Sequence, residues 1–154
     1  IRNPYIRFTE LLSISAMFFL LFSTLILIFG LFIKKDVFSF SFGGFIMLFV
    51  IIMSIVSFLM FINSLTDNKL AVTLITFLFA ALMLYVCGRI VPFAYLSEGV
   101  VSVGKVLPVY FWGKSLEASL FGDLNFTLVA IPVLITIFFY LASLGADKLT
   151  RRER

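Results

Sequence analysis

The 154-residue chain has no histidine, one cysteine and one tryptophan, and these shortages exclude several kinds of function. Proton transfer near neutral pH most often uses histidine, so its absence disfavours enzymes that depend on acid–base catalysis. Cys87 by itself can form no disulfide within the chain and supplies too few ligands for a metal site. We therefore expect the chain not to be an enzyme and to carry no catalytic and no metal-binding residue.

Charge is also scarce, because charged residues make up 13% of the chain and hydrophobic residues 62%. Soluble domains carry about 25% charged residues, and the mean hydropathy here is +1.19. This composition predicts an integral membrane protein in contact with the lipid bilayer. The net charge of +4 comes from basic residues that flank apolar runs, so it indicates orientation in the membrane and no nucleic-acid partner.

Four apolar runs are long enough to cross a bilayer, and none contains a charged residue. They are about residues 11–33, 42–62, 70–87 and 124–144. Because a membrane helix needs about 20 apolar residues, we predict an all-α membrane protein with four transmembrane helices in one domain, residues 1–154. Pro132 in the fourth run removes a backbone donor, which a membrane helix tolerates where a neighbour satisfies the freed carbonyl. The absence of intramembrane charge disfavours ion-driven transport.

The orientation follows from the number of spans and from the basic tail. Four spans place both ends of the chain on one side, and the tail contains Lys148, Arg151, Arg152 and Arg154 close to a membrane exit. Positive charge beside a span favours the cytoplasmic side. We therefore expect both ends to be cytoplasmic and the connection between the third and fourth spans to lie on the outer face.

That connection, about residues 88–122, is too polar to span a bilayer and too aromatic for an ordinary exposed loop. Pro92 and Pro108 interrupt it, which predicts two short helices at Phe93–Leu107 and Val109–Phe121. Its aromatic residues suit the headgroup level of a membrane. We predict an outer re-entrant helical hairpin before the last span. The alternative is an amphipathic cap that lies flat on the outer leaflet.

Four short motifs accompany this order of elements: Pro4-Tyr5-Ile6-Arg7, the turn from Ser64 to Lys69, Gly88-Arg89-Ile90-Val91-Pro92, and Leu107-Pro108-Val109-Tyr110-Phe111-Trp112. Together they resemble the C-terminal half of permease subunits of type-2 ATP-binding-cassette transporters. In that family a cytoplasmic coupling segment, three helices, an outer re-entrant hairpin after a glycine and a proline, and a last helix with a basic tail follow in this order.

The resemblance implies a membrane-spanning permease subunit of an ATP-driven exporter in a bacterial cytoplasmic membrane. A separate nucleotide-binding ATPase subunit would bind ATP and magnesium, and a second permease subunit would complete the translocation path. Family members have six spans, and this chain begins with Ile1, so we expect it to be part of a longer subunit. The implied sites are an outer gate (Gly88, Arg89, Pro92, Glu98, Pro108, Tyr110 and Trp112) and an ATPase-contacting segment (Arg2, Pro4, Tyr5 and Arg7).

Two other functions stay open on the residues. The first is a non-transporting membrane subunit or assembly factor that uses the aromatic hairpin as a docking surface. The second is a membrane enzyme acting on lipid headgroups, which would require Glu98 or Glu117. Gly113-Lys114-Ser115 matches the end of a phosphate-binding loop, but Pro108 stands where that motif requires glycine, so the chain has no such loop there.

Overall fold

The computed structural model describes residues 3–32, 42–121 and 125–152, with the backbone alone at 151 and 152, and all elements in these ranges are helical. The elements are α1 (Pro4–Phe32), α2 (Phe42–Leu65), α3 (Lys69–Val86), the 3₁₀ turn η1 (Phe93–Tyr95), α4 (Glu98–Gly104), α5 (Pro108–Phe121) and α6 (Phe126–Arg152). Helices α1, α2, α3 and α6 are long and apolar enough to span a membrane. The predicted all-α fold with four membrane-length helices is confirmed.

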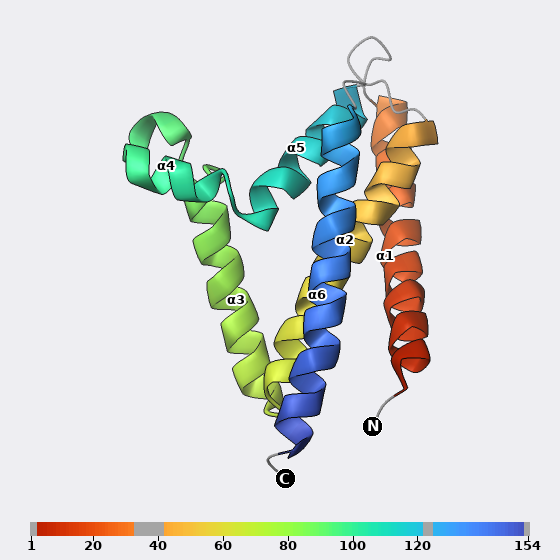
Figure 1. The fold of residues 1–154 in the computed structure, drawn as a ribbon. Coiled ribbons are helices and arrows are strands. Elements are labelled where there is room, and N and C mark those ends of the chain that lie inside the picture. Colours follow the sequence, from red (N-terminus) through yellow and green to blue (C-terminus); the bar gives the residue numbers. More distant parts are fainter. Residues whose placement is uncertain (1–2, 33–41, 122–124, 153–154) are drawn as a thin grey trace.

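The N-terminus of α1 and the C-terminus of α6 lie on the same side of the bundle (Figure 1). We call this the termini side, and the opposite side the α4–α5 side. Helix α1 begins at Pro4, well before the predicted start of the span at Leu11, because Asn3 accepts a hydrogen bond from the Tyr5 amide at 3.3 Å and proline suits the first helical position. Helix α6 continues to Arg152, past the predicted end at Leu144. The apolar runs therefore mark the crossing parts of longer helices.

Helix α2 forms the centre of the bundle and contacts α1, α3, α5 and α6. On one flank Leu48, Ile52 and Val56 form a buried cluster with Leu11 of α1. On the other flank Met47 and Ile51 pack against Trp112 of α5. Helix α3 contacts α2 near the termini side and α4 at its other end (Figure 1). The remaining helix faces are apolar and exposed, as expected for surfaces that meet lipid.

The segment between α3 and α6 divides differently from the prediction. The expected helix Phe93–Leu107 is wrong, because Leu96 and Ser97 adopt extended backbone (ψ 151° and 152°) and separate η1 from a short α4. The second helix is close to its predicted range and begins at Pro108. Helix α4 packs against α3, whereas α5 packs against α2 and α6. The two helices of this segment therefore have different neighbours.

A glycine turn directs the chain from α3 into this segment. Gly88 has a φ of +72°, which favours glycine over residues with a Cβ atom. The Arg89 amide donates to the Leu84 carbonyl at 2.9 Å, and the Gly88 amide donates to the Tyr85 carbonyl at 3.2 Å. These two bonds form the Schellman arrangement that ends many helices.

A second glycine sets the contact between α4 and α3. A Cβ atom at Gly104 would lie 2.1 Å from the Val86 carbonyl oxygen, so a side chain there requires the two helices to separate. In the same contact the thiol of Cys87, which is buried, donates to the Gly104 carbonyl at 3.4 Å. Cys87 is the single cysteine of the chain and therefore reports on this contact.

We predict that Gly104→Ala exposes Cys87. Overpacking costs about 1–3 kcal/mol, which raises the open population about ten-fold, so the rate of maleimide modification of Cys87 should rise by a similar factor. Gly99→Ala is the matched control on the same helix, since a Cβ atom there meets nothing within 4 Å. Equal labelling rates in the two variants would contradict the close contact.

Candidate functional site

Two buried hydrogen bonds fasten α5 to its neighbours. The indole Nε1 of Trp112 donates to the Ser54 hydroxyl of α2 at 2.7 Å. The hydroxyl of Ser115 donates to the Leu128 carbonyl of α6 at 2.8 Å. Trp112, Ser54 and Ser115 are all buried. Because a buried polar group without a partner costs free energy, these bonds specify where α5 docks.

The hydrogen bond from Ser115 replaces a helical hydrogen bond that Pro132 cannot make. Proline has no backbone N–H, so the carbonyl four residues earlier, that of Leu128, loses its helical donor. Ser115 supplies the donor instead. A neighbouring helix thus satisfies the carbonyl that Pro132 leaves without a helical donor. The Leu128 amide is satisfied as well, because it donates to the Asn125 side chain at 3.2 Å.

The bond from Trp112 places the first turns of α5 deep beside α2. Ser54 lies at the middle of α2, about 18 Å along the helix from Phe42. The ring of Phe58, one turn further from the α4–α5 side, packs edge-on against Trp112 with centroids 6.1 Å apart. Figure 1 shows α5 slanting from this level to the end of α6 on the α4–α5 side.

Nearer the end of α3, a charged pair links the turn after Gly88 to α5. The Nη1 atom of Arg89 lies 2.6 Å from a carboxylate oxygen of Glu117, and the two side chains are 35% and 44% exposed. The guanidinium packs over Gly113, where a Cβ atom would lie 2.1 Å from its Nη2. An exposed pair of this kind contributes about 0–1 kcal/mol, so it orients the segment more than it stabilises it.

The seven residues predicted for the gate fall into two groups. Six of them lie in the turn after α3 or in the first turns of α5: Gly88, Arg89, Pro92, Pro108, Tyr110 and Trp112. The ring of Phe93 contacts that of Tyr110 at a tilt of 40°, with centroids 6.3 Å apart. Glu98 instead lies exposed in the first turn of α4. It is on a different helix from Glu117, whose carboxylate pairs with Arg89.

On the termini side, Arg7 is buried against α6. Its Nη2 lies 2.8 Å from the Asp147 carboxylate, with side chains 7% and 21% exposed, and its Nη1 donates to the Ser143 carbonyl at 3.0 Å. The hydroxyl of Tyr140 donates to the Pro4 carbonyl at 2.8 Å. Of the predicted ATPase-contacting segment, Arg7 and Pro4 thus bind α6. Tyr5 is exposed, and Arg2 lies outside the described residues.

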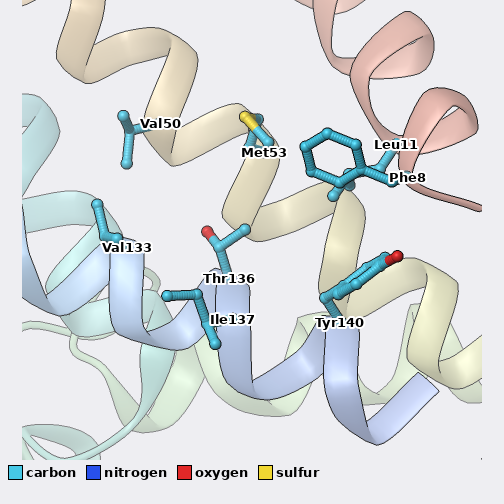
Figure 2. A pocket seen from close by; sticks show the side chains of 8 residues that line it. All are labelled: Phe8, Leu11, Val50, Met53, Val133, Thr136, Ile137 and Tyr140. Carbon is cyan, nitrogen blue, oxygen red and sulfur yellow. The ribbon is translucent and has the colours of Figure 1, made fainter. Parts of the chain in front are cut away.

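An apolar groove of about 230 Å³ lies between α1, α2 and α6. One face of α6 supplies Val133, Thr136, Ile137 and Tyr140, and α2 supplies Val50 and Met53 (Figure 2). Phe8 and Leu11 of α1 close the termini end. This groove could not be predicted from the sequence, because each lining residue is of a type found throughout the membrane-spanning runs.

Comparison with protein-family models, curated proteins and solved structures gives no match for this chain. Within residues 3–32, 42–121 and 125–152, no three histidine, cysteine, aspartate or glutamate side chains come together as they would in a metal site. The arrangement of the helices and the sequence pattern are therefore what support a function.

We predict that the cost of Ser115→Ala depends on Pro132. Alone, the substitution leaves the Leu128 carbonyl unpaired and should lower the free energy of unfolding by about 1 kcal/mol. In a Pro132→Ala background the amide at 132 can bond Leu128, so the cost should fall below half of that value. Unfolding by denaturing detergent in mixed micelles measures both.

Ser119→Ala is the control for this cycle, because Ser119 is buried on the same helix but donates within α5, to the Ser115 carbonyl at 2.7 Å. Its cost should be the same in both backgrounds. An identical cost of Ser115→Ala with and without Pro132 would show that the hydroxyl does not replace the missing amide.

Proposed function

We propose that this chain is a membrane-spanning permease subunit of an ATP-driven exporter of the type-2 ATP-binding-cassette class. The observation that carries the proposal is the depth of Trp112, whose indole bonds to Ser54 at the middle of α2. Together with the resemblance of the motifs, this supports a half-helix that enters the membrane between the third and fourth spans. A separate ATPase, with ATP and magnesium, would power the subunit.

In this proposal residues 88–122 form a re-entrant outer gate. A cap lying flat on the outer leaflet would hold Trp112 at headgroup level, whereas Ser54 is about 18 Å along α2 from Phe42. One feature favours a gate over a fixed plug. The ion pair of Arg89 and Glu117 within this segment is partly exposed, so breaking it costs little free energy.

The termini side would be cytoplasmic and receive the movement from the ATPase. There α1 is tied to α6 by the pair of Arg7 and Asp147. Helix α2 meets α6 there as well, because the Thr150 hydroxyl, which donates to the Ala146 carbonyl at 2.7 Å, also lies 3.2 Å from the Ser64 carbonyl. The ends of these three helices would therefore move together, and Tyr5, which is exposed, would offer a contact to the ATPase. A second permease subunit would complete the path.

The depth of Trp112 is directly measurable, because it is the single tryptophan of the chain. In bilayers of phosphatidylcholine brominated at different positions along the acyl chain, Trp112 should be quenched most by bromines far from the headgroup. The matched control carries Trp112→Phe and Tyr95→Trp, which moves the probe to the exposed ring position in η1. That probe should respond most to bromines near the headgroup. A shallow profile for both would support the flat cap.

The function itself predicts an ATPase partner. A tagged form of the protein, purified from its own membrane, should bring an ATPase with it, and ATP hydrolysis should require both components. Cysteines placed at Glu117 and Tyr110 in a Cys87→Ser background should change their labelling rate between ATP-bound and nucleotide-free states. A stable, active protein without any ATPase would contradict the proposal. An ATPase-independent labelling pattern would favour the docking subunit.

A further inference from the structure

We infer that the groove between α1, α2 and α6 binds one acyl chain of a membrane lipid. This site does not depend on the proposed transport function, since it follows from the lining, the size and the surroundings of the groove. The occupant is defined by its chemistry as a flexible hydrocarbon chain.

The lining offers no polar partner to a ligand, although two of its residues carry hydroxyl groups. The hydroxyl of Thr136 donates to the Pro132 carbonyl within α6 at 2.8 Å. The hydroxyl of Tyr140 donates to the Pro4 carbonyl of α1 at 2.8 Å. Both donors are thus engaged within the protein, and the remaining lining is aliphatic, thioether or phenyl. The groove selects for an uncharged, apolar occupant, because a charged or strongly polar one would lose its hydration without compensation.

The dimensions match a single hydrocarbon chain. Residues Val133 to Tyr140 run along two turns of α6, about 10 Å. The volume of about 230 Å³ lies below the range of about 300–1,000 Å³ that is typical of pockets for whole drug-sized ligands, so it suits one chain of a lipid. A methylene chain fits, because carbon atoms reach their best contact at about 4 Å.

The surroundings supply such a chain. Val133 and Ile137, at the rim, are 38% and 50% exposed and lie within a helix long and apolar enough to cross the membrane. The rim therefore opens to lipid hydrocarbon. An empty groove would forfeit the dispersion contacts of its walls, and dry apolar cavities bind apolar ligands readily. At the termini end the groove is closed by Phe8 and Leu11, so the acyl chain enters across the exposed rim at Val133 and Ile137.

The test measures lipid retention by the purified protein without ATPase or substrate. The probe is phosphatidylcholine with a nitroxide on its acyl chain, reconstituted with the protein in phosphatidylcholine bilayers. The wild-type protein should show a motionally restricted lipid component that persists when the lipid-to-protein ratio is lowered. Thr136→Phe and Val133→Phe fill the groove. Each should lower the affinity of the protein for the restricted lipid at least about ten-fold, since several methylene contacts are lost.

Leu134→Phe is the matched control, because Leu134 is exposed on the same helix and does not line the groove. It should leave the restricted component unchanged. Thermal unfolding of all variants checks their folding, and Val133→Phe and Thr136→Phe should be at least as stable as the wild type in lipid-free detergent, because they fill a cavity.

Absence of the restricted component in the wild type, or its equal loss in Leu134→Phe, would overturn the site. So would efficient disulfide cross-linking of Val133→Cys between two copies in a Cys87→Ser background, which would make the occupant a second chain. A missing ATPase partner would leave this result unaffected and would count only against the proposed function.

Discussion

A backbone carbonyl inside a membrane must find a donor, and in this protein one carbonyl decides how the helices are assembled. Pro132 deprives Leu128 of its helical partner, and Ser115 replaces it from α5. This bond gives α5 a fixed contact on α6, and the bond from Trp112 to Ser54 gives it a second contact on α2. With both made, the short helix crosses the junction of α2 and α6 and its first turns lie beside the middle of α2.

The ion pairs on the two sides of the bundle differ in how far their charges are buried. Removing one partner of a buried pair such as Arg7 and Asp147 typically costs about 3–5 kcal/mol, because a charge is left without compensation. The pair of Arg89 and Glu117 is partly exposed and is worth about 0–1 kcal/mol. A substitution that leaves one of these charges unpaired is therefore costly on the termini side and well tolerated on the α4–α5 side.

The sequence predicts the parts of the fold that depend on composition. The four charge-free runs identify the membrane helices, since length and apolarity alone determine which segments can cross. The ends of the helices do not follow from apolarity, because α1 is started by Asn3 and Pro4 outside the apolar run. Pro132 likewise indicates that a donor is required but not that Ser115 provides it.

Other features depend on residues that meet only in three dimensions. The extended backbone at Leu96 and Ser97 divides the first expected helix of the 88–122 segment, although neither residue is a strong helix breaker. The resemblance implies an ATPase contact for the segment that contains Arg7, and the side chain of Arg7 binds Asp147, near the other end of the chain. The topology places both on the same side, but only packing determines that the arginine turns inward.

The contacts of α1 indicate that the groove also affects how α1 and α6 pack against each other. This helix packs mainly on α2, and it bonds to α6 at its first turn, through Pro4 and Arg7. Further along, the walls of the groove separate α1 from α6, so protein atoms alone do not fix their spacing. An acyl chain in the groove would supply the missing dispersion contacts and act as a packing element between the two helices. The arrangement of α1 would then depend on the lipid that the protein carries as well as on its own sequence.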